Sequence, residues 1–248
     1  EEILPKLSFL KNWAQKEVKK NTTPPTPKID KTRIYFANKD NAAQSEIRIG
    51  YLALPYDALG EYYRAQVMNY TLGGNFNSRI NLNLREDKNI TYGAFSNFAG
   101  SKWVGAFTAY AGVKADATDT ALVEFMKEIK KFANDGVTAE ELSFTKSAIG
   151  QSDALKYEAP QQKAGFMKRI LDYNLPKDYV EKQNEILKNI TKEEVSKLAK
   201  KLLPYDNMLI VVVGDRKKCM ANLMKLGYEV IVVDAEGNPT DADVVEPH

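Results

Sequence analysis

Histidine and cysteine are almost absent from this sequence. Among its 248 residues there is one histidine, His248, and one cysteine, Cys219. A single cysteine excludes an internal disulfide framework, and it also excludes a zinc site built from several cysteines. No spacing of Asp and Glu indicates a carboxylate metal site either. We therefore expect no metal site in this chain, and we expect Cys219 to be an inert thiol.

Long apolar runs and an excess of one charge are also lacking. No apolar stretch reaches the length of a membrane span. Lys and Arg number 35 and Asp and Glu number 33, so the net charge is only +2, and no basic cluster is interleaved with aromatic residues. These features disfavour nucleic acid as a partner. The chain starts at Glu1 without a signal peptide, so we expect it to be part of a longer protein. Its compartment stays open, with periplasm and cytoplasm both possible.

What the sequence does contain is enough for one large domain. Six segments have the apolar alternation or the short apolar run of β-strands: 33–37, 46–54, 92–98, 103–113, 208–213 and 228–233. Residues 208–213 form a continuous apolar run, which predicts a strand buried on both faces. Helical periodicity is clearest from 117 to 135, and Thr138 with Glu141 and Thr191 with Glu194 are capping boxes. The pattern predicts an α+β fold, a two-layer domain with a mainly antiparallel six-stranded sheet and helices packed on one face.

The ends of the chain differ from this centre in composition. Residues 1–21 are expected to form a helix that belongs to a preceding segment, with Leu7, Leu10 and Trp13 along one side. Residues 22–30 contain three prolines and are expected to be an extended linker, although an ordinary surface loop fits equally well. We place the domain itself at 31–233. Residues 234–248 are expected to be a loose acidic tail.

The most informative stretch is Leu72 to Phe98, which reads LGGNFNSRINLNLREDKNITYGAFSNF. Glycines 73 and 74 with Asn75 predict a turn through the left-handed region. A short helix is expected next, with Ile80, Leu82 and Leu84 as its apolar residues and a break at Lys88-Asn89. A strand follows from Tyr92. This order predicts that the Arg85 guanidinium and the Tyr92 phenol lie beside the same turn.

The run LGGNFNSRINLNLRE followed by ITYG resembles the C-terminal, non-zinc-binding domain of the pitrilysin/insulinase family of zinc metallopeptidases, the inverzincins. The run ITKEEVSKLAKKLLPYDNMLIVVVGD, near the end, is similar to a second segment of that domain. The likeness covers about residues 31–233. Asn75 and Asn89 stand where the family commonly has Gly, and Asn is the next best residue for the left-handed region.

The resemblance implies a division of labour between two homologous halves that close around a peptide. The catalytic half carries the H-x-x-E-H motif and its zinc, and this chain lacks that motif, so it should be inactive alone. The family's paired Arg and Tyr correspond to Arg85 and Tyr92. Because attack on a peptide carbonyl develops negative charge on oxygen, Tyr92 is expected to bond near the scissile carbonyl and Arg85 a neighbouring one. The implied partners are a peptide and the zinc-bearing half, joined upstream or as a separate subunit.

Two alternatives remain open from the sequence. For the two side chains, Arg85 could pair with Glu86 or Asp87 on the surface while Tyr92 packs at a strand start. For the whole chain, it could be a degenerate structural or scaffolding subunit of the same fold with no peptidase role. Glu61, in the helix that would carry zinc ligands in the catalytic half, is expected to be an ordinary solvated carboxylate.

Overall fold

The computed structural model describes residues 4–14, 17, 25–153 and 159–240. At its N-terminal end lies a 3-10 helix, η1 (Leu4–Asn12), and the described residues from 5 to 14 are all exposed. Within the segment 1–21, for which a helix was predicted, the described residues are helical over Leu4–Asn12, whereas residues 13, 14 and 17 are not. A helix of this length without packing contacts has little to stabilise it. The acidic tail lies outside the described residues beyond Thr240.

A mixed sheet of six strands forms the centre of the described chain, and its order is β3-β4-β2-β5-β1-β6. Strand β1 pairs in parallel with β5 and β6, whereas the pairs β2–β4, β2–β5 and β3–β4 are antiparallel. The prediction of a mainly antiparallel sheet is confirmed. The strands are β1 (Arg33–Asn38), β2 (Gln44–Leu54), β3 (Thr91–Ala99), β4 (Gly105–Lys114), β5 (Leu209–Gly214) and β6 (Glu229–Val233).

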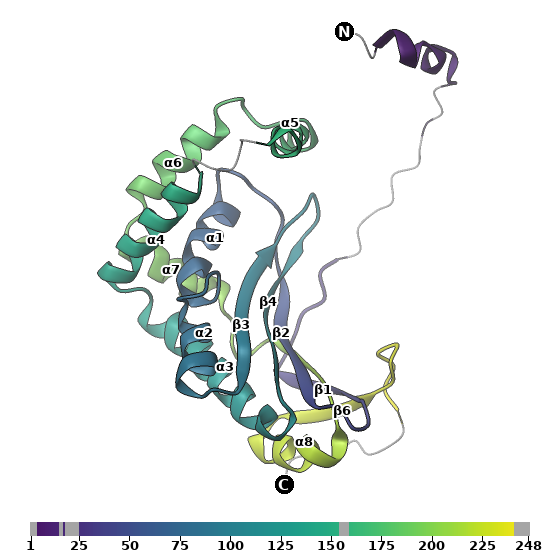
Figure 1. Cartoon of the computed structure of the whole chain (residues 1–248), viewed down its shortest axis with the longest axis vertical. Coiled ribbons are helices and arrows are strands. Elements are labelled where there is room, and N and C mark those ends of the chain that lie inside the picture. The colour runs from purple at the N-terminus through teal and green to yellow at the C-terminus, as the bar shows by residue number, and fades with distance from the viewer. Residues whose placement is uncertain (1–3, 15–16, 18–24, 154–158, 241–248) are drawn as a thin grey trace.

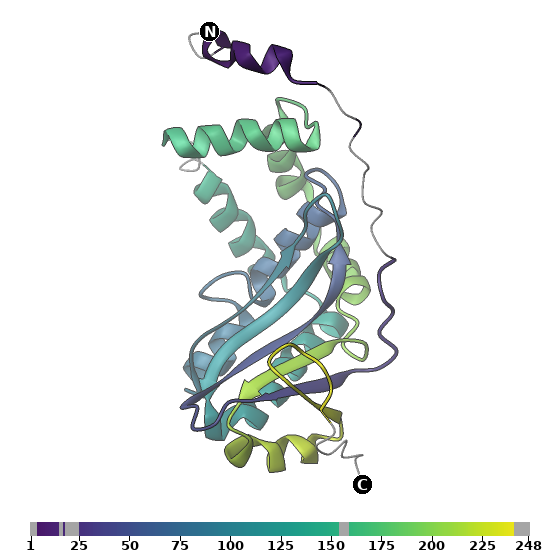
Figure 2. The ribbon, with the colours of Figure 1, turned by 90° about the vertical axis from the view of Figure 1, so that its right-hand side faces the viewer.

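Helices cover one face of this sheet, which confirms the predicted two-layer α+β fold (Figure 1 and Figure 2). The capping boxes at Thr138–Glu141 and Thr191–Glu194 form as predicted. The helical segments are α1 (Glu61–Leu72), α2 (Arg79–Asn81), η2 (Leu82–Asp87), η3 (Ala115–Ala117), α3 (Thr118–Asp135), α4 (Ala139–Asp153), α5 (Pro160–Tyr173), α6 (Tyr179–Asn189), α7 (Lys192–Leu202), α8 (Arg216–Leu223) and η4 (Met224–Leu226).

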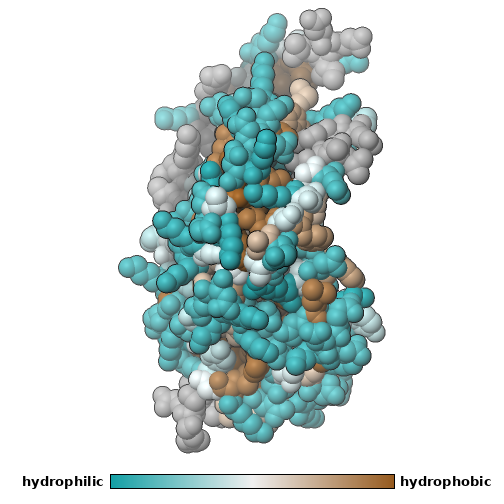
Figure 3. Space-filling model, turned by 90° about the vertical axis from the view of Figure 1, so that its left-hand side faces the viewer, coloured by the Kyte–Doolittle hydropathy of each residue, from teal (hydrophilic) through white to brown (hydrophobic). Residues whose placement is uncertain are grey.

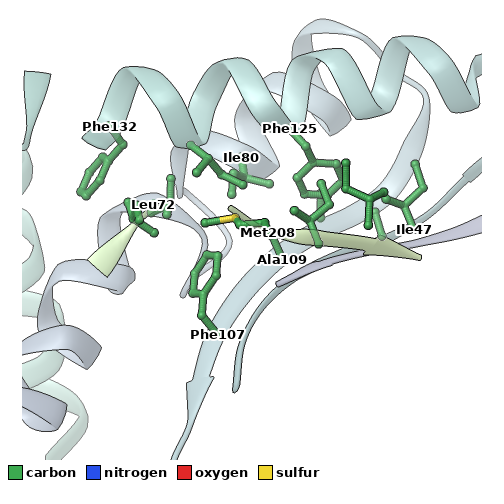
Figure 4. Close-up of a cluster of buried hydrophobic side chains, with 14 of the residues drawn as sticks. Ile47, Leu72, Ile80, Phe107, Ala109, Phe125, Phe132 and Met208 are labelled. Atoms are coloured by element: carbon green, nitrogen blue, oxygen red, sulfur yellow. The ribbon is translucent and has the colours of Figure 1, made fainter. Parts of the chain in front are cut away.

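The hydrophobic core lies between the sheet and helices α1 and α3 (Figure 4). Successive side chains of a strand point to opposite faces, so every second residue reaches the helices. Residues with no exposed surface come from the strands and from the apolar stripe of α3: Ile34, Phe36, Ile47, Ile49, Phe107, Ala109, Ile210, Val212, Leu122, Phe125, Ile129 and Phe132.

The opposite face of the sheet is not covered by the described helices, and this corrects the prediction for the apolar run 208–213. In β5, Ile210 and Val212 are fully buried, but Leu209 is 36% exposed and Val211 is 39% exposed. Leu52 of β2 is 43% exposed on the sheet as well. A continuous apolar run predicts burial on both faces, yet the helices in the described ranges form a layer on one face alone.

The edge strand β3 is fastened to the end of α1 by buried polar groups. Asn69 Nδ2 donates to the Ser96 carbonyl oxygen at 2.7 Å, and Ser96 Oγ donates to Asn69 Oδ1 at 2.6 Å. The Ser96 amide donates to the Gly73 carbonyl oxygen at 2.8 Å. Asn69 and Ser96 are 2% and 3% exposed. Because each polar atom that the chain buries here has a partner, the desolvation cost is offset.

Gly73 is required for a reason other than the predicted one. Its φ is −158°, which is extended backbone, so no left-handed conformation is involved. A Cβ at this position would lie 2.2 Å from Ser96 Oγ and 2.6 Å from the Ser96 amide nitrogen. The glycine therefore permits a close approach of α1 to β3. The predicted left-handed break at Asn89 is confirmed, with a φ of 53°.

A partly buried ion pair connects α2 to α4. Arg79 Nε and Nη2 donate to the two carboxylate oxygens of Glu141 at 2.6 and 2.7 Å, and Nη2 also donates to the Gly136 carbonyl oxygen. The guanidinium lies 4.9 Å from the centre of the Phe132 ring. Burial raises the pKa of Glu141, but the hydrogen bonds from Arg79 and Thr138 outweigh it, so the pKa is lowered overall.

Replacing Gly73 by Ala should destabilise the domain because the new methyl group collides with Ser96. We expect Gly73→Ala to reduce the free energy of unfolding by about 2 kcal/mol. Gly165→Ala is the matched control, since nothing lies within 4 Å of a Cβ on that residue of α5. The control should raise the stability by about 0.5 kcal/mol. Urea unfolding measures both, and equal effects of the two changes would contradict the close approach.

Replacing Arg79 should also destabilise the domain, because it leaves Glu141 without its main partner. We expect Arg79→Gln to cost about 2 kcal/mol at pH 7. The exposed pair Arg48–Glu46 supplies a control, and Arg48→Gln should cost at most about 0.5 kcal/mol.

The pH dependence of this loss follows from the lowered pKa of Glu141. A carboxyl whose pKa is lowered in the folded state stabilises the protein above its unfolded pKa, and the contribution is lost as the pH falls through the folded value. The difference between wild type and Arg79→Gln should therefore shrink below the ordinary Glu value of 4.5. A difference that stays constant from pH 7 to pH 3 would refute this account of the pair.

Candidate functional site

The predicted residues Arg85 and Tyr92 lie on either side of the short connection from η2 to β3. Arg85 is in η2 (Leu82–Asp87), which is a π-helix that continues directly from α2. Tyr92 is the second residue of β3, the edge strand of the sheet. No hydrogen bond, ion pair or ring contact joins the two side chains in the described structure.

The π-helix changes which side chains of this segment are buried. Of the three apolar residues expected in this helix, Ile80 and Leu84 have no exposed surface, whereas Leu82 is 42% exposed. Asn81 and Asn83 are buried in its place, at 0% and 8% exposure. The wider turn of a π-helix shifts side chains from their α-helical positions, and such turns are frequent at functional sites.

Asparagine side chains hold this irregular segment in place. Asn81 Nδ2 donates to the Phe76 carbonyl oxygen at 2.6 Å, and its Oδ1 accepts from the Ala94 amide at 3.0 Å. Asn83 Nδ2 donates to Glu124 and Glu128 of α3, both at 2.8 Å. The helical part is therefore tied to β3 on one side and to α3 on the other. The spacing of these asparagines at alternate positions was the signal in the sequence that could have indicated this arrangement, and it went unused.

The guanidinium of Arg85 lies over an aromatic ring. Its guanidinium carbon is 4.4 Å from the centre of the Phe76 ring, and its Nη1 forms an ion pair with Glu86. The side chain of Arg85 is 33% exposed, and Phe76 is 53% exposed. Stacking orients the plane of the guanidinium and leaves its edge available for hydrogen bonds. No motif in the sequence pointed to Phe76.

Tyr92 projects away from the protein because the strand is irregular there. The register of β3 against β4 shifts between Thr91 and Ala94, which makes Tyr92 and Gly93 a β-bulge. Thr91 Oγ1 donates to the Gly112 carbonyl oxygen at 2.7 Å and accepts from the Gly93 amide at 3.1 Å. Bulges of this kind redirect side chains at sheet edges. Tyr92 is 90% exposed, and its hydroxyl bonds to no other described residue.

The surface alternative foreseen from the sequence holds for one residue and fails for the other. Arg85 does pair with Glu86, as that alternative requires. Tyr92 does not pack at the strand start, because almost all of its side chain is exposed. A large aromatic side chain that is this exposed, on a backbone this well fixed, indicates a contact with another molecule or segment.

The described residues do not fit a zinc ion. No group of three or more His, Cys, Asp or Glu in the described ranges could hold a metal, and His248 lies outside them. Cys219 is buried, its thiol donates to the Asp215 carbonyl oxygen, and burial raises its pKa, as expected for an inert thiol. Glu61 is less solvated than predicted, because it pairs with Lys201 at 2.6 Å. Among the described residues, no helix is long and apolar enough to cross a membrane.

Sequence comparison with curated proteins finds relatives that are named as a zinc protease and as a non-peptidase homolog. The chain is 27% identical over 178 residues to a Bacillus subtilis protein named "Uncharacterized zinc protease YmxG", covering 71% of this chain and 43% of that one. It is 20% identical over 193 residues to the Helicobacter pylori "Non-peptidase homolog YmxG", covering 74% and 45%. The chain thus spans less than half the length of these two relatives.

Solved structures give the same result for the fold. A peptidase M16 inactive domain from Pseudomonas fluorescens superposes with a TM-score of 0.71 at 25% identity, covering 80% of this chain and 46% of that one. The first half of the periplasmic protease PqqL from Escherichia coli superposes with a TM-score of 0.64 at 16% identity, covering 91% and 52%.

A comparison with protein families agrees with the curated relatives and with the solved structures. The family described as "Peptidase M16 inactive domain" matches residues 1–149, which is more than half of the chain. The resemblance inferred from the LGGNFNSRINLNLRE and ITYG segments is thereby confirmed. This chain belongs to the family of inactive domains of M16 peptidases.

Proposed function

We propose that this chain is the substrate-holding, non-catalytic half of a zinc-dependent peptidase whose zinc lies on another domain or subunit. The proposal rests chiefly on Tyr92, an exposed phenol on a fixed β-bulge. Its hydroxyl is a donor without a partner among the described residues, at the rim of an edge strand. In this proposal residues 1–21 belong to a preceding segment, residues 22–30 are a linker, and residues 31–233 are the domain that holds the substrate.

The chemistry required of this half is charge stabilisation and substrate alignment. When a hydroxide attacks a peptide carbonyl, negative charge develops on the carbonyl oxygen. A phenol O–H that reaches this oxygen stabilises the transition state more than the ground state. In the proposed arrangement Tyr92 supplies that donor from the wall opposite the metal. Zinc, held by the other half, supplies the Lewis acid and the activated water.

Arg85 has a different role in this arrangement. Its guanidinium stacks on Phe76 and its charge is partly neutralised by Glu86. A stacked guanidinium presents several N–H groups at fixed angles, which suits a carbonyl oxygen that is already polar before the reaction. We assign Arg85 to a substrate carbonyl next to the scissile bond. This contact exists in the ground state and in the transition state alike.

These roles require a cleft, and a second domain or subunit would complete it. Neither Arg85 nor Tyr92 lines any of the five main cavities of the described chain. Two halves that close face to face would place both side chains in the gap between them. The partner is therefore part of the proposal, either upstream in the same protein or as a separate subunit.

The alternative function is a structural subunit of the same fold. One structural observation favours it, the ion pair of Arg85 with Glu86, which a purely structural residue could also form. The Helicobacter pylori relative is named a non-peptidase homolog, and it is 20% identical to this chain. Cleavage assays separate the two functions. The chain alone should not cleave peptides, whereas adding its zinc-bearing counterpart should restore cleavage.

Removing the Tyr92 hydroxyl should slow the chemical step. In the assembled peptidase we expect Tyr92→Phe to lower kcat by about 10²-fold with little change in KM, because loss of one oxyanion donor acts mainly on the transition state. Tyr110→Phe, on the neighbouring strand β4, is the matched control and should leave kcat unchanged. Stopped assays with a fluorogenic peptide measure both constants. An unchanged kcat for Tyr92→Phe removes the proposed role.

Removing the Arg85 charge should weaken substrate binding instead. We expect Arg85→Gln to raise KM about tenfold with a smaller effect on kcat, because the lost contact acts equally on ground state and transition state. Arg48→Gln, on the open face of the sheet, removes the same charge elsewhere and should change neither constant. Equal KM values for the two variants would assign Arg85 to the surface pair with Glu86 only.

A further inference from the structure

A cavity lined by tyrosines lies at the other end of α1 from Arg85 and Tyr92. It has a volume of about 420 Å³, and its lining residues come from α1, α4, α5, α6 and Tyr56, which follows β2. This volume is within the range of about 300–1,000 Å³ that is typical of small-ligand sites. Its lining consists of Tyr56, Tyr62, Tyr63, Gln66, Val67, Tyr70, Ile149, Arg169 and Gln183.

Hydrogen bonds fix one wall of this cavity. Tyr62 donates its hydroxyl proton to the Phe98 carbonyl oxygen at 2.9 Å and accepts from Gln66 Nε2 at 2.8 Å. The Gly100 amide also donates to the Tyr62 hydroxyl at 3.2 Å. Gln183 Nε2 donates to the Ala58 carbonyl oxygen at 2.7 Å, which joins α6 to the segment before α1. The wall is therefore formed before any ligand arrives.

Aromatic rings make up half of the remaining lining, from Tyr56, Tyr63 and Tyr70. The Tyr56 ring lies 5.2 Å from that of Tyr62 and 4.2 Å from that of Tyr173, measured between ring centres. At the far side the Tyr70 ring is 6.5 Å from that of Phe144, which is 48% exposed. Tyrosine-rich surfaces contact a partner over a large area at low entropic cost. Figure 3 shows apolar atoms between polar side chains on the helical side of the molecule.

One charged group that lines this cavity has no oppositely charged partner among the described residues. Arg169 is exposed and forms no ion pair with a described residue. Burial raises the pKa of Tyr56 to about 12, while the charge of Arg169 partly opposes that rise, so the guanidinium is close enough to act on the phenol.

We propose that this cavity binds a peptide residue that has an aromatic or large aliphatic side chain and a carboxylate beside it. The rings, Val67 and Ile149 receive the side chain, and Arg169 pairs with the carboxylate at the mouth. A cationic ligand, which tyrosine rings alone would favour, is repelled by the same guanidinium. The inference rests on the proposed function, because it assigns a second contact with the peptide that Arg85 and Tyr92 hold.

The carboxylate has two possible sources, the C-terminus of the peptide or a neighbouring Asp or Glu. Four probes separate them in an NMR titration of the 248-residue chain with ring-labelled tyrosine. The acetylated tripeptide Ala-Ala-Phe with a free C-terminus should shift the signals of Tyr56 and Tyr62, and its amide should bind at least about fivefold more weakly. Ala-Asp-Phe amide tests the side-chain source, and Ala-Ala-Ala with a free C-terminus tests the need for the ring.

Two matched variants test the role of Arg169. Arg169→Gln should weaken binding of the free-acid Phe peptide about five- to tenfold, because an exposed charged hydrogen bond is partly screened by water. Lys163→Gln removes an exposed charge from the same helix and should have no effect. Ile149→Trp should abolish binding by filling the cavity. Equal affinities of the two charge variants, or equal binding of the Phe and Ala peptides, would overturn the proposal.

The binding experiment and the cleavage experiment test independent claims, so a negative result in one leaves the other unaffected. Peptide binding is measured on this chain alone and requires neither zinc nor the catalytic half. A Tyr92→Phe enzyme with unchanged kcat removes the oxyanion role and leaves the titration result intact. Conversely, a cavity that binds none of the four peptides removes this second contact, while the effects of Arg85 and Tyr92 on cleavage remain.

Discussion

The close approach of the end of α1 to the edge strand β3 is the constraint on which the candidate site depends. Gly73 leaves room for Ser96, and Asn69 closes two buried hydrogen bonds with the same residue. This contact fixes where the chain leaves α1 and where β3 runs beside it. The backbone between these two elements, which runs from the turn through α2 and η2, must therefore connect two fixed ends. The irregular backbone of that span is the consequence.

The span is irregular in two places, and each carries one of the two candidate residues. The π-helix positions Arg85 against Phe76, and the β-bulge turns Tyr92 out of the sheet. Regular helix or strand geometry in either place would be more stable locally, so buried asparagines and Thr91 have to hold both deviations. Strained or irregular backbone that is this well supported is characteristic of functional sites.

Two surfaces of the domain are thus suited to contact with a peptide, one at each end of α1. The first surface consists of the Arg85 guanidinium and the exposed Tyr92 phenol, and a second domain or subunit has to close over it. The second is a cavity with preformed tyrosine walls and one guanidinium at its mouth. The open face of the sheet is a third apolar surface, with Leu52, Leu209 and Val211 partly exposed, but the described chain does not indicate what covers it.

The sequence by itself determined the fold class, the helix starts at Thr138 and Thr191, and the place of Arg85 and Tyr92 around one turn. These follow from local rules, because alternation, caps and left-handed breaks depend on neighbours along the chain. The one-sided burial of β5, the exposure of Leu82 and the true reason for Gly73 were decided only by the tertiary structure. Each depends on segments that are distant in sequence: the described helices, which cover only one face of the sheet, the α3 carboxylates that accept hydrogen bonds from Asn83, and Ser96. No local pattern encodes such contacts, so they emerge only when the chain is packed.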